Sequence, residues 1–110
     1  MRMWLVDPTK MCRKHLLGEH VEMHMFVGTL NKGKNIHGFL RNKLVDTDVI
    51  KERHDILALE MERRGYNHKS PLEQPELEKH FKTVNVAENE IDLAGRCSDC
   101  AALLNLGEAS

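Results

Sequence analysis

The sequence predicts an all-α fold, a single compact domain of three to four helices joined by long loops. Apolar residues recur at helical spacing in two long segments, at about 9–30 and 46–64. No segment shows the convincing apolar–polar alternation of a half-buried strand. The chain has 110 residues, of which 41% are hydrophobic and 30% charged, which favours a soluble globular domain with one core over a disordered chain.

The first predicted helix runs from Thr9 to about Leu30. Asp7 can cap its first amides, and Pro8 fits the first helical position because an N–H would be unpaired there anyway. Residues three or four apart form its inner stripe: Leu16, His20, Met23, Val27 and Leu30. The turn at 31–34 (Asn-Lys-Gly-Lys) ends this helix.

The remaining elements follow from capping and breaking residues. Residues 31–45 are a connection with a short helical turn near Phe39, and a second helix covers 46–64, where Gly65 can end it. Its inner stripe consists of Ile50, His54, Leu57 and Met61. Because Pro75 interrupts the segment 71–81, any helix there is short or restarts at Pro75. Asn85 can cap a last helix that runs towards Cys97.

We therefore expect one helical domain over residues 1–110, with a core at 1–84 and a C-terminal helix with a C-x-x-C tail at 85–110. No segment approaches the ~18 uninterrupted apolar residues of a membrane span. The first residues become acidic too soon for a secretory signal, and three cysteines, an odd number, indicate a reducing compartment. The expected location is the cytoplasm.

Charge is divided unevenly along the chain. Residues 1–43 carry eight basic and three acidic side chains, whereas residues 44–110 carry eight basic and fourteen acidic ones, for a net charge of −1. A basic half can hold phosphates while the whole molecule stays near neutral. Two ordinary solvated surfaces are the alternative interpretation.

One face of the first predicted helix can carry acid–base chemistry. His15, Glu19, Glu22 and Phe26 fall at i, i+4, i+7 and i+11 and so share that face. Two carboxylates and an imidazole near basic residues are suited to proton transfer on an anionic ligand. A solvated helix face is the alternative.

Two further groups have metal-ligand spacing. His20 and His24 are four residues apart on a helix, but the spacing identifies no third ligand. Cys97 and Cys100 form one C-x-x-C, and zinc would need two more ligands, from Cys12, His80 or a second chain. We favour core or surface histidines and reduced, partly buried thiols, so no metal or other cofactor is expected. A helical module that binds metal or a partner through this tail, without catalysis, is the alternative function.

Several short motifs occur in a fixed order: Met1-Arg2, His15-Leu16, Glu19-x-x-Glu22, Phe26, Gly28 and Arg64-Gly65-Tyr66-Asn67. Through them, residues 1–70 resemble the pyrimidine-dimer DNA glycosylases of the endonuclease V type, first known from a bacteriophage. The stretch 13–20 looks especially like bacterial members. The phage enzyme carries arginines on either side of its catalytic glutamate, whereas this chain has Val21 and Met25. The aromatic, basic C-terminal segment of the phage enzyme also has no counterpart.

The resemblance implies a helical enzyme that acts on double-stranded DNA containing ultraviolet-induced cyclobutane pyrimidine dimers or abasic sites. The α-amino group of the first residue attacks the anomeric carbon, expels the base and forms an imine, and β-elimination then cuts the strand. Here that residue is Met1, because the size of Arg2 should block removal of the methionine. An α-amine has an ordinary pKa of about 7.7–8.0, so a useful fraction is neutral and nucleophilic.

The resemblance also implies roles for other residues. Glu22 is the assisting carboxylate, and His15 and Glu19 form a supporting shell on the same helix. DNA phosphates are expected to contact basic residues of the N-terminal half: Arg2, Arg13, Lys14, Lys32 and Lys34. We expect a monomer that associates with the nucleoid.

Overall fold

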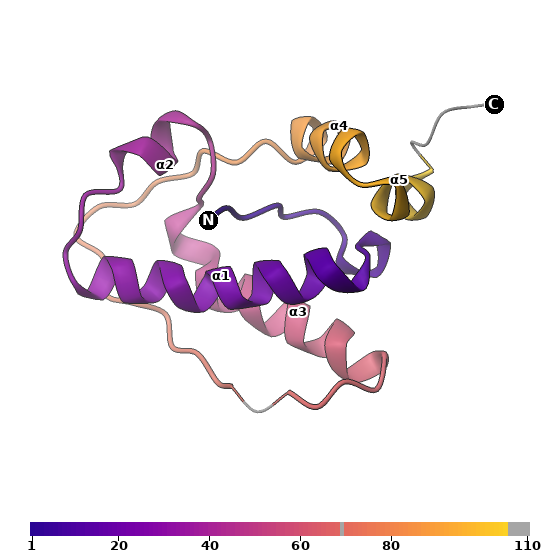
Figure 1. Cartoon of the computed structure of the whole chain (residues 1–110). Coiled ribbons are helices and arrows are strands. Elements are labelled where there is room, and N and C mark those ends of the chain that lie inside the picture. Colours follow the sequence, from indigo (N-terminus) through magenta and orange to yellow (C-terminus); the bar gives the residue numbers. More distant parts are fainter. Residues whose placement is uncertain (69, 106–110) are drawn as a thin grey trace.

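The computed structural model describes residues 1–68 and 70–105, which form five α-helices and two 3₁₀ turns (Figure 1). In chain order the elements are η1 (Pro8–Lys10), α1 (Arg13–Asn31), α2 (His37–Arg41), η2 (Thr47–Val49), α3 (Ile50–Arg63), α4 (Val86–Arg96) and α5 (Ser98–Leu104). These residues contain no β-strand beyond an isolated bridge between Asp46 and Lys82, so the all-α class is confirmed. Residues 106–110 of the predicted C-terminal segment lie outside the described residues.

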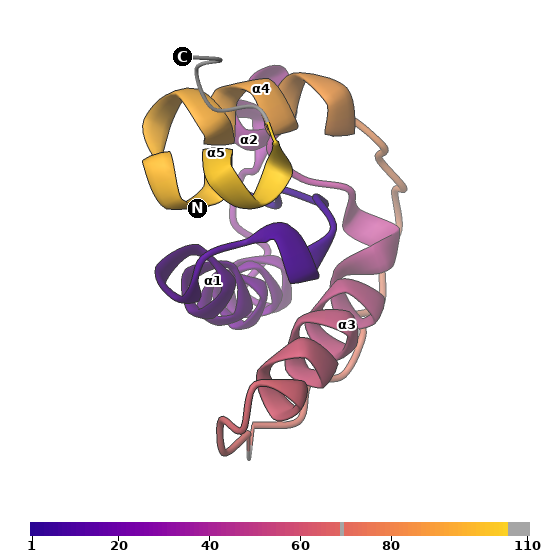
Figure 2. The ribbon, with the colours of Figure 1, turned by 90° about the vertical axis from the view of Figure 1, so that its right-hand side faces the viewer.

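The chain's first residues run through the middle of the molecule. Figure 2 shows the extended N-terminal segment between α1 on one side and the α4–α5 pair on the other. Met3, Trp4 and Val6 of this segment are buried, and the Met3 amide donates to the Leu44 carbonyl oxygen over 2.7 Å. The amino terminus is thus part of the core packing. None of the helices in the described part of the chain has the length and apolar character needed to cross a membrane.

The first long helix begins later than predicted. Asp7 caps η1 instead, where its Oδ1 accepts the Thr9 amide over 3.0 Å. Met11 then takes an extended conformation and is 0% exposed, and Cys12 follows as the extended N-cap of α1. A continuous helix from Thr9 would not allow this break, which lets the Met11 side chain enter the core.

The apolar side of α1 is largely the predicted one. Leu16, His20 and Met23 are buried as expected, while Val27 and Leu30 are half-buried against the core. The helix ends at a turn in which Gly33 has a φ of +65°, a conformation that glycine adopts without steric cost. The predicted end of this helix near residue 31 is therefore confirmed.

A buried ion pair joins α1 to α3. The Arg53 guanidinium, 4% exposed, donates through Nε and Nη2 to the two Glu19 carboxylate oxygens over 2.7 and 2.8 Å. Glu19 is 1% exposed, and its Oε2 also accepts the Trp4 backbone amide over 3.1 Å. One carboxylate therefore fixes two helices and the N-terminal segment relative to one another.

The second long helix agrees with the sequence prediction. The predicted segment 46–64 forms η2 and α3, and the predicted inner residues Ile50, His54, Leu57 and Met61 are all buried. Gly65 has a φ of +86°, and the Tyr66 amide reaches back to the Met61 carbonyl oxygen over 2.9 Å. This is the expected glycine termination.

No helix forms between residues 71 and 81, where the sequence left open a helix that is short or restarts at Pro75. The Gln74 side chain instead makes two hydrogen bonds to the backbone. It donates to the Thr47 carbonyl oxygen of η2 over 2.8 Å, and it accepts the Lys51 amide of α3 over 3.1 Å. Asp46 Oδ1 accepts the Thr83 amide over 2.6 Å. These bonds hold the segment extended against the chain around η2, while Pro71 and Pro75 cannot donate helical hydrogen bonds.

The C-terminal part forms two helices where the sequence predicted one. Asn85 caps α4 as expected, with its Oδ1 accepting the Glu88 amide over 3.0 Å. Cys97 leaves the helical path at φ −140° and ψ 112°, and α5 follows at once. Its buried residues Cys100, Ala101 and Leu104 face the core, which explains why the C-x-x-C tail is helical.

Replacing Glu19 with Gln should destabilise the fold, because the Arg53 charge would remain buried without its counter-ion. We expect a loss of about 3–5 kcal/mol in the free energy of unfolding, measured by urea denaturation. Glu62→Gln, at an exposed glutamate of α3, is the matched control and should stay within about 0.5 kcal/mol of the parent. Equal effects of the two substitutions would contradict the proposed importance of the buried pair.

Glu60 should make stability depend on pH. Hydrogen bonds from Arg63 and Arg64 lower the pKa of Glu60 from 4.5 to about 2, and Arg64 also donates to the Met11 carbonyl oxygen over 2.7 Å. A carboxyl whose pKa is lower in the folded state stabilises the fold above pH 4.5 and loses this effect as the pH falls towards 2. Glu60→Gln should therefore cost about 1.5–3 kcal/mol at pH 7. In urea denaturation series from pH 7 to pH 3, that difference should shrink below pH 4.5, and a constant difference would refute the linkage.

Candidate functional site

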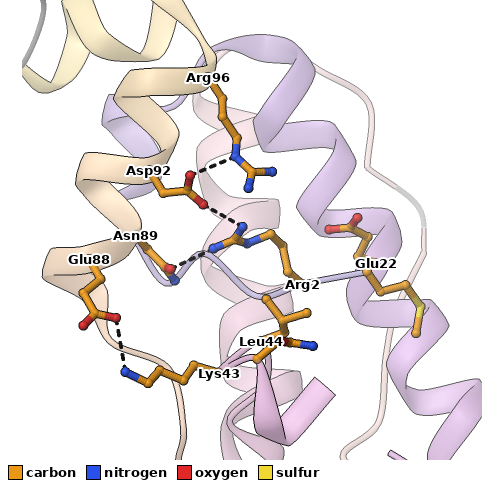
Figure 3. Close-up of a pocket in the computed structure, with 10 residues that line it drawn as sticks. Arg2, Glu22, Lys43, Leu44, Glu88, Asn89, Asp92 and Arg96 are labelled. Atoms are coloured by element: carbon orange, nitrogen blue, oxygen red, sulfur yellow. Dashed lines mark hydrogen bonds and ion pairs between the residues drawn. The ribbon is translucent and has the colours of Figure 1, made fainter. Parts of the chain in front are cut away.

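A cleft of about 640 Å³ lies where the amino terminus meets α1, the segment after α2, and α4. Figure 3 shows its charged side chains pointing into a shared space from these elements. Its lining residues are Met1, Arg2, Glu22, Asn42, Lys43, Leu44, Glu88, Asn89, Asp92 and Arg96. Clefts of this size are typical of small-molecule and substrate sites.

Met1 and Glu22, the two residues predicted to be catalytic, both line this cleft. Burial raises the pKa of Glu22 above its ordinary value of 4.5. A hydrogen bond from the Arg2 backbone amide and the positive charge of the α-amino group oppose this rise. The amine and the carboxylate therefore interact electrostatically, and Glu22 can hold or release a proton closer to neutral pH than an ordinary glutamate.

The Arg2 side chain is directed at α4. Its Nη1 lies 2.9 Å from Asp92 Oδ2, and its Nη2 donates to Asn89 Oδ1 over 2.8 Å. The guanidinium also stacks on Trp4, 3.7 Å from the ring centroid. Asn89 in turn donates to the Trp4 carbonyl oxygen over 2.9 Å. Arg2, predicted to contact DNA phosphate, is thus the group that holds the start of the chain against α4.

The other charged groups of the cleft were missed as site residues. Lys43 Nζ lies 3.4 Å from the Glu88 carboxylate, and Arg96 Nε lies 2.8 Å from that of Asp92 (Figure 3). Lys43 itself has a φ of +59°, the left-handed region that non-glycine residues rarely adopt. No motif marks these residues, because the cleft forms only when α4 folds back onto the first residues of the chain.

The two predicted supporting residues lie apart. Glu19 lies beneath the N-terminal segment and binds the Trp4 amide, so it supports the cleft from below. His15 lies next to Cys12, Cys97 and Cys100, with its Nδ1 3.2 Å from Cys12 Sγ. Seven residues separate His15 from Glu22, which corresponds to about 10 Å along a helix. A shared helix face therefore does not bring the two side chains together.

The remaining predicted phosphate contacts lie outside the cleft. Arg13, Lys14, Lys32 and Lys34 are exposed and occupy the two ends of α1, about 28 Å apart by helical rise. The Arg13 guanidinium lies 5.3 Å from the centroid of the Tyr66 ring. Val21 and Met25 lie between these ends, near Glu22 in the sequence of α1. Their side chains are 55% and 49% exposed. The helix surface that flanks Glu22 outside the cleft is thus apolar, and these four cations lie further away along α1.

The predicted pair His20 and His24 belongs to a larger group. His54 of α3 and His68 of the following segment complete it, with ring centroids 4.5–5.2 Å apart. Burial and the neighbouring imidazoles lower the pKa of His20 to about 4. Among the described residues, the buried Nε2 atoms of His20, His24 and His68 have no hydrogen-bond partner. These imidazoles have the chemistry of metal ligands, and α1 alone supplies only two of them.

The sequence was also compared with known proteins. The sequence model of the family described as pyrimidine dimer DNA glycosylase matches residues 1–74, two thirds of the chain. The chain belongs to this family. Neither the search of curated proteins nor the search of solved structures found a match. The matched region contains Met1, Glu22 and the segment 42–44 of the cleft, while α4 and α5 lie beyond it.

Removing the charge of the α-amino group should raise the pKa of Glu22 further. The positive amine favours the ionised carboxylate, so Nα-acetylation removes a stabilising charge. Carbon-detected NMR titration of the Glu22 carboxyl group should give a pKa above 4.5 in the free protein and a higher one after acetylation. Glu60 is the internal control, and its pKa of about 2 should not change. An unchanged Glu22 titration would mean that the amine does not act on this carboxylate.

Proposed function

We propose that this family member is a DNA glycosylase with abasic-site lyase activity, which acts on cyclobutane pyrimidine dimers in double-stranded DNA. The α-amino group of Met1 is the nucleophile, and Glu22 is the carboxylate that assists it. The family match supports the glycosylase activity. The observation that carries the assignment of residues is the interaction between the α-amino charge and Glu22 within one cleft.

The first step forms a bond between the neutral amine and the anomeric carbon of the damaged nucleotide. The glycosidic bond breaks and the base leaves with its electron pair. The C1′–O4′ bond of the sugar then opens, O4′ takes a proton, and the nitrogen, having lost a proton, forms the imine with C1′. Glu22 can stabilise the positive charge that develops on the sugar, and its raised pKa suits proton transfer. Beta-elimination then breaks the C3′–O bond after loss of a C2′ proton, and water releases the imine.

Arg2 is a positioning residue in this mechanism. Its contacts with Asn89 and Asp92 fix the residue next to the nucleophile, and its backbone amide favours the ionised form of the assisting carboxylate. Held in this way, the amine loses little freedom when it attacks, which lowers the entropic part of the barrier. α4 therefore contributes to catalysis without supplying a reacting group.

The DNA backbone has cationic partners at the edge of the cleft. Lys43 and Arg96 line it and are paired with carboxylates at the surface, which phosphate oxygens can replace. The exposed Val21 and Met25 offer apolar contacts to bases or sugars instead of the arginines of the phage enzyme. Reaching the sugar requires local distortion of the duplex, which costs a few kcal/mol and less at a damaged, poorly stacked site.

Borohydride trapping tests the proposal. Untagged protein is incubated with a duplex that contains one abasic site, and in parallel with one that contains a thymine dimer. We expect a reduced covalent adduct with both duplexes, mapped by mass spectrometry to the α-amino group of Met1. Glu22→Gln should slow strand cleavage by about 10²–10⁴-fold, the usual contribution of general acid–base catalysis.

Matched controls separate chemistry from folding. Nα-acetylated protein should bind the duplex but form no adduct, and Glu62→Gln should trap and cleave as the parent does. Absence of an adduct with both duplexes, from folded protein with a free amino terminus, would overturn the lyase mechanism. An amino-terminal sequence that starts at Arg2 would overturn the assignment of Met1.

A further inference from the structure

Four potential metal ligands meet at the starts of α1 and α5. Cys12 and His15 lie three residues apart around the beginning of α1, and Cys97 and Cys100 have the same spacing around the beginning of α5. The ligand atoms of all four residues lie within 4.8 Å of one another. Cys12 Sγ lies 3.2 Å from His15 Nδ1 and 3.8 Å from Cys97 Sγ, and Cys100 Sγ lies 3.7 Å from the same His15 Nδ1.

These separations match a tetrahedral zinc site. Bonds of about 2.3 Å to sulfur and about 2.0–2.1 Å to nitrogen place two sulfurs about 3.8 Å apart, and a sulfur and a nitrogen about 3.6 Å apart. The three observed separations scatter around these values. Three cysteines and one histidine are also a ligand set typical of structural zinc sites.

We propose that Cys12, His15, Cys97 and Cys100 bind one Zn²⁺ ion in a closed structural site. Four protein ligands leave no open position for substrate or water, so the ion supplies stability and no chemistry. Binding requires three thiolates and a neutral imidazole, so the thiols release their protons as the metal enters. The site is independent of the Met1 and Glu22 cleft.

The surroundings are suited to thiolate ligands. The Cys12 backbone amide donates to Cys100 Sγ over 3.3 Å. The His15 ring packs edge-on against Trp4, with ring centroids 6.2 Å apart. Such outer contacts orient the ligands of a metal and stabilise the negative charge of its thiolates.

A disulfide explains this cluster less well. All three cysteines are free, and the 3.8 Å between Cys12 Sγ and Cys97 Sγ is far from the ~2.05 Å of a disulfide. Any disulfide within the chain would also leave one of the three thiols and His15 without a partner. A zinc ion uses all four groups and joins positions that are 85 residues apart in the chain.

Metal analysis of the full chain tests the proposal. Protein produced in zinc-replete medium should contain one zinc per chain by elemental analysis. Metal-free protein titrated with Co²⁺ should develop the d–d bands of tetrahedral cobalt and a thiolate-to-cobalt charge-transfer band, and Zn²⁺ should displace them. The thermal midpoint should rise on adding zinc, because the ion binds only the folded state.

Matched histidine variants identify the ligands. His15→Gln should lose the stoichiometric zinc, whereas His37→Gln, at an exposed histidine of α2, should keep it. Cys97→Ser with Cys100→Ser should abolish the cobalt charge-transfer band. Circular dichroism at low temperature verifies that these variants fold, and the cobalt titration of the parent protein decides the case if they do not.

Several outcomes would overturn the proposal. They are iron in place of zinc, no metal in the parent protein, or parent-like zinc binding in the double cysteine variant. The last result would assign the metal to the histidines around His20, and His20→Gln would then abolish it. A Cys12–Cys97 disulfide found by mass spectrometry in freshly purified, non-reduced protein would also contradict a zinc site. None of these results bears on the trapping experiment, so the two proposals fail separately.

Discussion

The buried Glu19 carboxylate is the interaction on which the rest of this structure depends. It neutralises Arg53 and accepts the Trp4 amide, so α1, α3 and the first residues of the chain share one polar anchor. The proposed amine nucleophile at the start of the chain needs such an anchor, because termini are ordinarily poorly ordered. With Trp4 fixed from below and Arg2 bound to α4 from above, the Met1 amine has little freedom to move away from Glu22.

Two separate clusters of polar side chains depend on this arrangement of α1, α3 and the N-terminal segment. The cleft places an amine and a carboxylate of raised pKa in contact with solvent, as proton transfer requires. In the proposed zinc site, the three thiols and the imidazole near α5 fill all four positions of the ion, as a structural metal requires. α4 and α5 lie beyond the region that matches the family, yet they complete both clusters.

Elements that depend on local sequence patterns could be predicted from the sequence. Features that depend on contacts between residues far apart in the chain could not. Periodicity and capping predicted α1, α3 and α4, because spacing and Asn85 are local signals. The later start of α1 depends on burial of Met11. The extended conformation of residues 71–81 depends on the hydrogen bonds of Gln74 to η2 and α3. Met1 and Glu22 came from family resemblance, whereas Arg96 and the partners of His15 required the three-dimensional arrangement.

Arg2 and its partners on α4 are far apart in the sequence, so their contacts form late during synthesis of the chain. Arg2 leaves the ribosome among the first residues, but its partners Asn89 and Asp92 follow 87 and 90 positions later. A growing chain folds from its N-terminal part as it emerges, at about 5–20 residues per second. At that rate, several seconds pass between the synthesis of Met1 and the synthesis of the α4 residues that bind Arg2. A chain that ends before α4 has the proposed nucleophile without the Arg2 contacts that hold it, so the proposed site forms only after α4 has been synthesised.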